Sequence, residues 1–348
     1  MNKNNGISFK NTRFVVACFT IVLLIAVLIS LTMGYLHIPI GQILHIVSER
    51  LAGSAPSTHQ MADTFRAVIF DVRLPRILTC VAVGGALSVS GVLFQGILLN
   101  PLADPYTLGV SAGAAFGASV AILLNLSATF VSIPLFAFIG ACATLFFVVF
   151  LSYSSKQNAA GLSSNNLILS GIIVAAILSA GISFLKFVAN EQVSVIIFWL
   201  MGSFASKTWG NFWTVLIFLG LGTGIALFYA RDLNLISLGN RAASSLGVNL
   251  KRITLILLIT GSMLAAISVS ISGIIGFVGL LVPHMIRFLT GPDNRRLIPV
   301  SLLAGAILLL AADTITRAVL PHEIPIGILT ALTGGPVFCW IFKKSRMR

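Results

Sequence analysis

The segment Arg73–Gly117 constrains the fold of this chain more than any other, because it holds two apolar, glycine-rich stretches joined by a turn with Pro101 and Pro105 at its ends. In lipid, leucine packs on leucine hardly better than on acyl chains, so small residues mark the faces on which helices approach closely. We therefore expect two membrane helices that pack tightly on their neighbours. The segment predicts an all-α, polytopic membrane protein.

The composition supports this fold class and argues against two others. Hydrophobic residues make up 57% of the chain and charged residues only 9%, which lies outside the usage of soluble domains. A net charge of +13 would suit nucleic-acid binding if the basic residues were clustered on a water-exposed face, but they fall between apolar stretches. The four cysteines stand alone, which predicts neither a disulfide framework nor a metal site. We expect this chain to bind no cofactor of its own.

Apolar windows of roughly 20 residues, the length that crosses ~30 Å of hydrocarbon, predict about ten spans in one transmembrane domain, residues 1–348. The first, Phe14–Thr32, is interpreted as a retained span, because it is long and lacks the small-residue pattern of a signal-peptide cleavage site. The stretch Gln192–Met201 is too short to cross and predicts a re-entrant or interfacial helix. The ten predicted centres lie near residues 23, 86, 116, 142, 174, 219, 261, 281, 308 and 333.

The distribution of basic residues predicts the orientation of these spans. An even number of spans places both termini on one side of the membrane. If that side is the cytoplasm, 15 Lys and Arg residues lie inside and 7 lie outside, as the positive-inside rule requires. The largest loops are then an outer one at about 36–72 and a cytoplasmic one at about 231–250.

The cytoplasmic loop carries two Leu-Gly pairs, Leu238-Gly239 and Leu246-Gly247, eight residues apart. Glycine commonly ends a helix, so the loop predicts short helical pieces. We interpret it as a structured docking platform, and a merely solvated connector remains the alternative.

Catalytic and nucleotide-binding motifs are weak in this sequence. It lacks the G-x-x-x-x-G-K-[ST] loop that cradles phosphate, and no cluster of His and Asp indicates a metal site. Gly109-Val110-Ser111-Ala112-Gly113 matches G-x-S-x-G, the pattern of a nucleophilic serine. However, Gly109, Gly113 and Gly117 recur at every fourth residue, which favours close helix packing over catalysis by Ser111.

Four charged residues near the predicted outer ends of spans are candidates for function, since charges inside a membrane are costly. Asp313 precedes Arg317 by four residues, so the two can pair on one helix face. Whether Asp313 serves function or only neutralises Arg317 stays open. Arg73 and Arg76 lie at the outer start of the second span, and snorkelling of these arginines to lipid headgroups is one interpretation.

Seven motifs, weak singly and specific in this order, resemble the permease subunit of the bacterial importers for iron-siderophore complexes, haem and vitamin B12. The resemblance covers roughly Arg73 to the C-terminus. The motifs are RLPR (73–76), NPLADP (100–105), LGVSAGA (108–114), SLGNRAASSLGV (237–248), GIIGFVGLLVPHMIR (273–287), ADTITR (312–317) and EIPIGILTALTGGPVF (323–338).

The resemblance implies a type II ABC importer permease with both termini in the cytoplasm. Its expected partners are a second permease subunit, identical or paralogous, two cytoplasmic ATPase subunits that use ATP and Mg, and an external binding protein. It implies a cytoplasmic gate at Asn100 and Leu102, to which residues 152–161 contribute. It also implies ATPase-coupling residues and binding-protein docking residues. These are Leu238, Gly239, Ala243, Leu246 and Gly247 for coupling, and Arg73, Arg76 and Arg317 for docking.

We therefore expect a non-catalytic importer subunit for a metal chelate, first a ferric siderophore and next haem or cobalamin, in the bacterial cytoplasmic membrane. One departure weakens the coupling assignment, because the acidic residue that often follows the first Leu-Gly pair in the family is Asn240 here. From other classes, an intramembrane serine hydrolase using Ser111 and a secondary transporter remain as alternatives. The sequence shows no convincing inverted repeat of the kind that many secondary transporters have.

Overall fold

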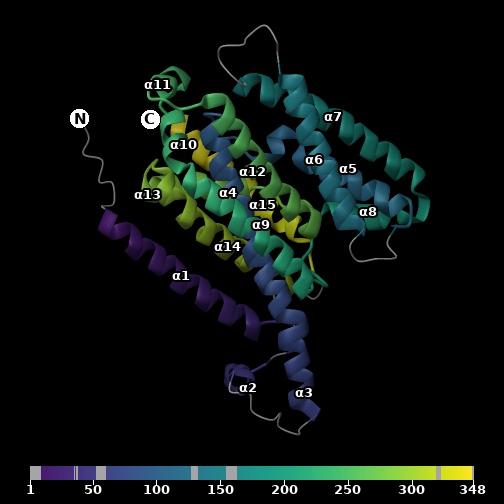
Figure 1. The fold of residues 1–348 in the computed structure, drawn as a ribbon. Helices are drawn as coiled ribbons and strands as arrows, with labels where there is room; N and C mark the ends of the chain where they lie inside the picture. Colours follow the sequence, from purple (N-terminus) through teal and green to yellow (C-terminus); the bar gives the residue numbers. More distant parts are fainter. Residues whose placement is uncertain are drawn as a thin grey trace.

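The computed structural model describes residues 9–34, 36, 38–51, 60–126, 132–153, 163–318 and 323–346. These residues form α-helices, a few single-turn 3-10 helices and one π-helical segment, with no strand among them (Figure 1). The helices are α1 (Phe9–Thr32), α2 (Ile40–Leu51), α3 (Gln60–Ala67), α4 (Leu74–Ile97), α5 (Val110–Leu123), α6 (Ser132–Ser152), α7 (Ser164–Val188), α8 (Val193–Leu200), α9 (Trp209–Phe228), α10 (Ala230–Ile236), α11 (Asn240–Ser245), α12 (Leu250–Ser272), α13 (Val278–Thr290), α14 (Asn294–Ala318) and α15 (Ile326–Arg346).

Each of the ten predicted span centres falls inside a helix. Seven of these helices are long and apolar enough to cross a membrane by themselves. The other three, α5, α13 and α15, are shorter apolar helices within the described residues. The predicted short helix at 192–201 is present as α8. A multi-pass, all-α membrane protein is thus confirmed, while the count of ten crossings stays a prediction.

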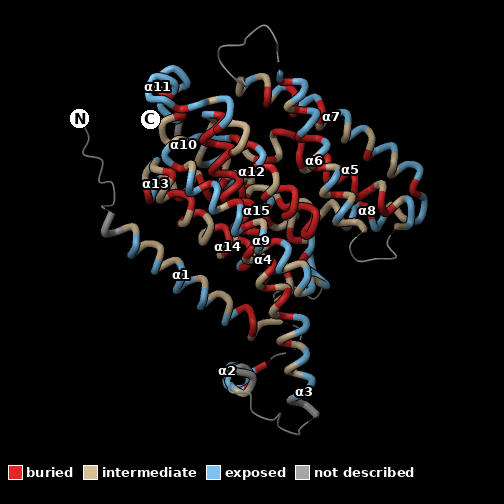
Figure 2. The backbone as a smooth tube through the Cα atoms, in the orientation of Figure 1, coloured by how far each residue is buried: buried red, intermediate tan, exposed pale blue. Residues whose placement is uncertain are grey.

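Helix α4 forms the centre of the molecule and packs against α14, α12, α9 and α13. Nearly all of its residues are buried, and Figure 2 shows the buried stretches in the middle of the bundle. Its glycines make this possible, because a Cβ atom at Gly84 would lie 2.4 Å from the carbonyl oxygen of Gly305 on α14. A Cβ at Gly91 would lie 1.8 Å from the carbonyl oxygen of Gly279 on α13. The glycine-rich sequence therefore builds a helix that neighbours contact through their backbones.

A second group of helices, α5 to α8, packs beside this centre (Figure 1). Helix α5 packs closely on α6 and also contacts α7 and α8. By contrast, α1 packs mainly on α14, and most of its surface is exposed or half-buried (Figure 2).

The two ends of the bundle differ in what they carry. The described start of α1 and end of α15 lie at the same end as α10 and α11, whereas α2 and α3 lie at the opposite end (Figure 1). An arrangement with both termini on one side is what the sequence predicts. Which side of the membrane this is stays a prediction, so we call the two ends the terminal end and the opposite end.

Candidate functional sites

A buried ion-pair network occupies the opposite end, where α4 meets α14. The Asp313 carboxylate is 1% exposed and lies 2.9 Å from Nη2 of Arg76. It also lies 3.5 Å from Nε of Arg317, four residues later, which confirms the pairing expected from their spacing. Glu323, half exposed before α15, accepts from Nη1 of Arg76 at 2.9 and 3.1 Å. Arg76 is thus held between one buried carboxylate and one exposed carboxylate.

Two arginines at this end, Arg73 and the Arg317 of the ion-pair network, hydrogen-bond to the last turn of α1 and the residues after it. Arg73 donates to the carbonyl oxygens of Leu31 and Leu36, and Arg317 donates to that of Met33 at 2.8 Å and to that of Ser30. These carbonyls belong to the last turn of α1 and the residues beyond it, where a helix leaves acceptors without partners. The arginines therefore satisfy the end of α1 and do not snorkel to lipid headgroups in this structure.

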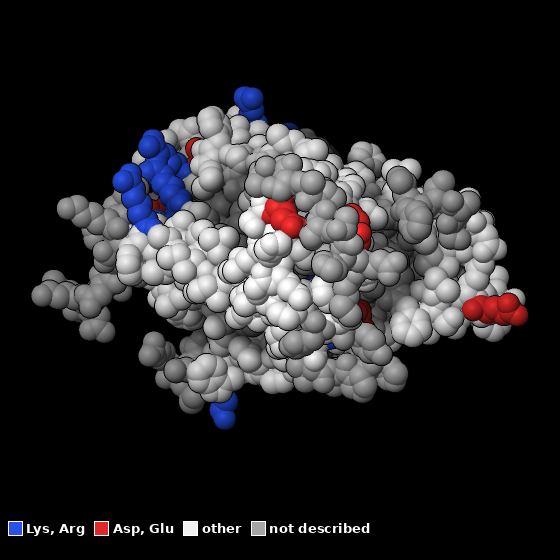
Figure 3. All heavy atoms as spheres, turned by 90° about the horizontal axis from the view of Figure 1, so that it is seen from below, with Lys and Arg blue, Asp and Glu red and all other residues white. Residues whose placement is uncertain are grey.

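This cluster holds more positive than negative charge. Lys207, in the loop between α8 and α9, lies near enough to Arg76 that burial, together with the Arg76 charge, lowers the pKa of Lys207 to about 8. Three arginines and this lysine face only two carboxylates, Asp313 and Glu323. Seen from this end, most of the described surface is uncharged (Figure 3). Docking of a partner on Arg73, Arg76 and Arg317 stays a prediction, and their side chains already have partners within the chain.

A π-helical segment, Val68–Arg73, joins α3 to α4 and makes one continuous rod from them. Such segments release a backbone carbonyl from the helical pattern. Here the indole N–H of Trp209, at the start of α9, donates to the carbonyl oxygen of Phe70 at 3.0 Å. Where the structure describes the predicted outer loop at 36–72, the loop is largely helical, because it contains α2, α3 and most of this π-helical segment.

The turn between α4 and α5 carries the predicted gate at the terminal end. Leu99 has φ 51°, a conformation that residues other than glycine rarely adopt, and is 46% exposed. The Asn100 side chain accepts from the backbone N–H of Leu102 at 2.9 Å, and Leu102 is 37% exposed. Asn100 therefore shapes the turn, and the leucines project from it. Most of the predicted contribution from 152–161 lies outside the described residues.

Asp104 fixes the second half of this turn. Its carboxylate accepts from the backbone N–H groups of Tyr106 and Thr107 at 3.1 and 2.9 Å, and the Tyr106 hydroxyl donates to the carbonyl of Ile275 at 2.6 Å. Burial raises the pKa of Asp104 to about 6, against the opposing effect of the two backbone donors. The turn is thereby bound to the segment that precedes α13.

The two Leu-Gly pairs bracket α11, which projects from the terminal end (Figure 1). Gly239 has φ 104° and Gly247 has φ 86°, so both occupy conformations that favour glycine. Leu238 is 68% exposed and Leu246 is 60% exposed, so both present apolar side chains at the surface beside α11. Ala243 is fully buried, so it supports the platform from within and offers no surface to a partner.

The three predicted packing glycines do not form one helical stripe. Gly109 has φ 74° and precedes α5 as its N-cap, which a sequence spacing of four did not reveal. The other two face α6, where a Cβ at Gly113 would lie 2.4 Å from the Gly140 carbonyl and a Cβ at Gly117 2.1 Å from the Phe136 carbonyl.

Ser111 lies in the first turn of α5, and no described hydrogen bond joins it to a histidine or a carboxylate. No group of three or more His, Cys, Asp or Glu side chains suited to a metal ion occurs within the described ranges.

Comparison with known proteins identifies the family of this chain. The sequence matches the FecCD transport family over residues 22–344. The chain belongs to the FecCD transport family. It is 39% identical to the molybdate import system permease protein MolB of Haemophilus influenzae, over 94% of this chain and 95% of that protein. It is also 39% identical to the hemin transport system permease protein HmuU of Yersinia pestis, over 82% of this chain and 85% of that protein.

A solved structure described as a metal-chelate type ABC transporter, in an inward-facing conformation, has the same fold. It matches with a TM-score of 0.82 and 34% identity, over 95% of this chain and 99% of that chain. FecCD proteins are the permease subunits of ABC transporters, in which separate subunits hydrolyse ATP. The chain is therefore a transport subunit and not an enzyme, which excludes the serine hydrolase. Being an ABC permease, it is also not a secondary transporter.

Proposed function

We propose that this chain is the transmembrane subunit of a type II importer that carries a metal chelate, with a ferric siderophore as the first candidate cargo. The observation that supports this choice most is the likeness over nearly the whole chain to a transporter described as of the metal-chelate type. Sequence identity alone does not choose the cargo, because the molybdate and hemin permeases are equally similar at 39%.

The cargo can be identified by uptake into cells that lack the native gene. Cells expressing the complete transporter are offered radioactive ferric siderophore, hemin, cobalamin and molybdate side by side, with a variant of the ATPase subunit unable to hydrolyse ATP as the control. The proposal expects ATPase-dependent uptake of the siderophore. Uptake of hemin, cobalamin or molybdate alone would reassign the cargo and leave the importer assignment in place.

The proposed assembly holds two permease subunits, two ATPase subunits and an external binding protein in the bacterial cytoplasmic membrane. The exposed leucines 238 and 246 support an ATPase contact at the terminal end, because exposed apolar side chains on a water-facing element commonly mark an interface. Under this proposal the terminal end faces the cytoplasm, as the excess of basic residues there predicts.

The cluster of Arg73, Arg76, Arg317 and Lys207, which outnumbers its two carboxylates, supports docking of acidic side chains of a binding protein at the opposite end. Arg76 is the arginine best placed for this, since one of its two carboxylate partners, Glu323, is half exposed and can exchange. Charges at the rim of an interface chiefly affect the association rate and its salt dependence. We expect Arg76→Gln to slow association with the binding protein and to weaken the effect of salt. Because the change also leaves buried Asp313 with one partner fewer, surface plasmon resonance is measured on variant protein that elutes as the folded transporter in size-exclusion chromatography. Lys186→Gln on α7 is the control, and equal association rates for both variants would argue against this docking site.

The turn at Asn100 and Leu102 is the proposed cytoplasmic gate. Leu102→Ala removes a projecting side chain and should raise the leak of small solutes from liposomes, while leaving the turn intact. Asn100→Ala removes the hydrogen bond to the Leu102 N–H and should raise the leak as well. The control is Leu221→Ala, a lipid-facing leucine on α9 that is 66% exposed. A leak that stays at the wild-type level in both gate variants would place the gate elsewhere.

A further inference from the structure

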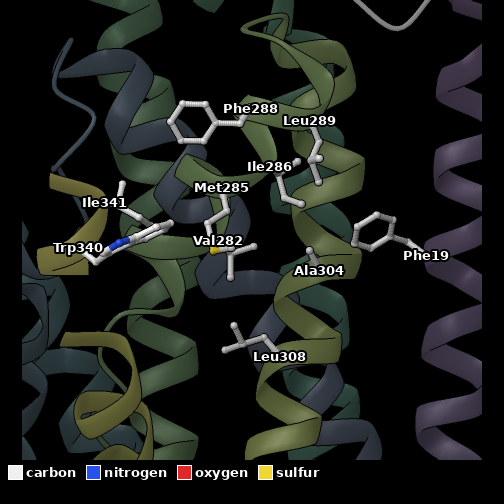
Figure 4. A pocket seen from close by; sticks show the side chains of 10 residues that line it. All are labelled: Phe19, Val282, Met285, Ile286, Phe288, Leu289, Ala304, Leu308, Trp340 and Ile341. Atoms are coloured by element: carbon white, nitrogen blue, oxygen red, sulfur yellow. The ribbon is translucent and has the colours of Figure 1, made fainter. Parts of the chain in front are cut away.

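A groove of about 710 Å³ runs between α1 and the helices α13, α14 and α15 (Figure 4). Its lining is apolar, and the side chains come from all four helices. They are Phe19, Val282, Met285, Ile286, Leu308 and Trp340, with four further apolar neighbours. Helix α1 forms one wall of the groove but packs mainly on α14, so the space beside α13 and α15 is left unfilled by this chain.

A second cavity of about 450 Å³ extends the groove toward the opposite end. The two share Phe19, Met285, Ala304 and Leu308. Together they follow α14 from Ala304 to Ile315, a rise of about 16 Å at 1.5 Å per residue. The hydrocarbon core of a bilayer is ~30 Å thick, so the groove has about the length of one leaflet.

Exposed basic residues stand beside the terminal end of the groove on two of its four helices. Arg13 precedes Phe19 by six residues on α1, and Lys343 follows Trp340 by three on α15. Arg287 on α13 does not line the groove, because it is half-buried and donates to the side-chain oxygen of Gln95 on α4 at 3.2 Å. Arg13 and Lys343 are exposed, and neither takes part in a salt bridge between described residues. The groove is therefore apolar along its length and positively charged at one end.

We propose that this groove binds one acyl chain of an anionic phospholipid, whose headgroup phosphate lies against Arg13 and Lys343. The apolar walls and the leaflet-long path fit a single acyl chain. The two cations fit a negatively charged headgroup, and a basic residue near a membrane surface favours anionic lipid by about fivefold. The lipid would fill the space between α1 and the bundle and so join α1 to α13 and α15.

The test is native mass spectrometry of the complete transporter after reconstitution in vesicles of phosphatidylcholine and phosphatidylglycerol, followed by extraction in mild detergent. Wild type should retain one phosphatidylglycerol per permease chain. Ala304→Trp fills the groove and should lower this retention about tenfold. Leu221→Trp, on the exposed face of α9, is the matched control and should retain lipid as wild type does.

The headgroup contact is tested with exposed residues, whose replacement does not threaten folding. The double variant Arg13→Gln with Lys343→Gln should lose its preference for phosphatidylglycerol over phosphatidylcholine by roughly tenfold or more. Arg231→Gln, an exposed arginine at the same end but outside the groove, should keep the preference.

Three outcomes would overturn the proposal. They are no retained lipid in wild type, equal retention by the two tryptophan variants, and equal binding of both lipids by wild type. A fourth is a loss of permease pairing in Ala304→Trp with unchanged lipid, since the same spectra report subunit number and would then assign the groove to a second copy of the chain.

Discussion

Asp313 is the residue on which the opposite end depends, because a single buried carboxylate pairs with both Arg76 and Arg317. Removing one partner of a buried ion pair leaves the other charge without compensation and costs about 3–5 kcal/mol. We expect Asp313→Asn to lower the free energy of unfolding by this amount. Glu323→Gln should cost about 1 kcal/mol or less, because the Glu323 side chain is half exposed.

Thermal unfolding of the two variants in detergent, followed by tryptophan fluorescence, measures this contrast. A conservative change at either site keeps the side-chain volume, so the difference reports on charge and burial alone. Equal shifts in Tm for the two variants would mean that water reaches Asp313 and that this carboxylate is not buried in solution.

Asp104 gives the stability of the turn between α4 and α5 a pH dependence. Its folded-state pKa of about 6 exceeds the ordinary value of 3.8, so between these values the folded chain holds a proton that the unfolded chain has lost. Stability therefore falls as pH rises through this window and is lowest above pH 6. Asp104→Asn keeps an oxygen that accepts from the same backbone N–H groups but does not titrate.

We expect the wild-type Tm to fall relative to that of Asp104→Asn as pH rises from about 4 to about 6, and the difference to stay constant above that range. The full effect is at most roughly 3 kcal/mol, since each pKa unit corresponds to ~1.4 kcal/mol. Parallel Tm curves for the two proteins across the window would show that the carboxyl titrates normally in the folded chain.

At the residue scale, the sequence predicted only contacts between residues that lie close together along the chain. The pair Asp313 and Arg317 was predictable because four residues separate its members on one helix face. The pair Arg76 and Asp313 was not, because 237 residues separate them and only the packing of α4 on α14 brings them together. The role of Arg73 was missed for the same reason, since its acceptors are backbone carbonyls that no side-chain pattern reveals.

At the scale of elements, close contact between α5 and α6 depends on glycine. A Cβ at Gly113 would lie 2.1 Å from Oγ1 of Thr144 and 2.4 Å from the Gly140 carbonyl oxygen, so even alanine must push the helices apart. Overpacking of this kind costs typically about 1–3 kcal/mol. We expect Gly113→Ala to lower Tm and the yield of assembled transporter, as size-exclusion chromatography would measure.

Gly224→Ala on α9 is the matched control, because a Cβ there meets no atom within 4 Å. Alanine is favoured over glycine in a helix by up to about 1 kcal/mol, so this variant should be neutral or slightly more stable. If both variants behave alike, the effect at Gly113 is one of helix propensity and not of packing.

Apolar length predicted where the membrane helices lie but not how each one ends. All ten centres fall in helices because hydrophobic length is a property of the local sequence. The π-helical segment before α4 and the left-handed Phe277 before α13 were not predictable, since these conformations are fixed by tertiary contacts. The same limit explains Gly109, which the fourfold spacing placed inside α5 and which instead caps it.

At the scale of the whole molecule, the sequence motifs identified the transporter family but could not choose the cargo. Two relatives with the same 39% identity to this chain are named for different cargoes, molybdate and hemin. The resemblance rests on motifs that build the helix contacts, the turn at Asn100 and the platform around α11. Under the proposed function these parts serve folding and energy coupling, which transporters of different cargo have in common. Cargo recognition therefore has to be measured and cannot be inferred from these motifs.

The platform around α11 provides the last prediction, because a permease without its own phosphate loop needs a surface for an ATPase. Leu238 and Leu246 are the proposed contact residues, since both are exposed, whereas Ala243 is buried and offers no surface to a partner. The double variant Leu238→Ser with Leu246→Ser replaces two water-exposed apolar side chains, so the permease should fold normally and keep its Tm.

Burial of apolar area at an interface contributes about 25 cal/mol per Å², so the loss of two leucines should weaken ATPase association at least tenfold. Copurification and ATPase-dependent uptake would measure this loss, with Leu221→Ser on the lipid-facing side of α9 as the control. Normal association of the double variant would show that the ATPase binds elsewhere on the terminal end.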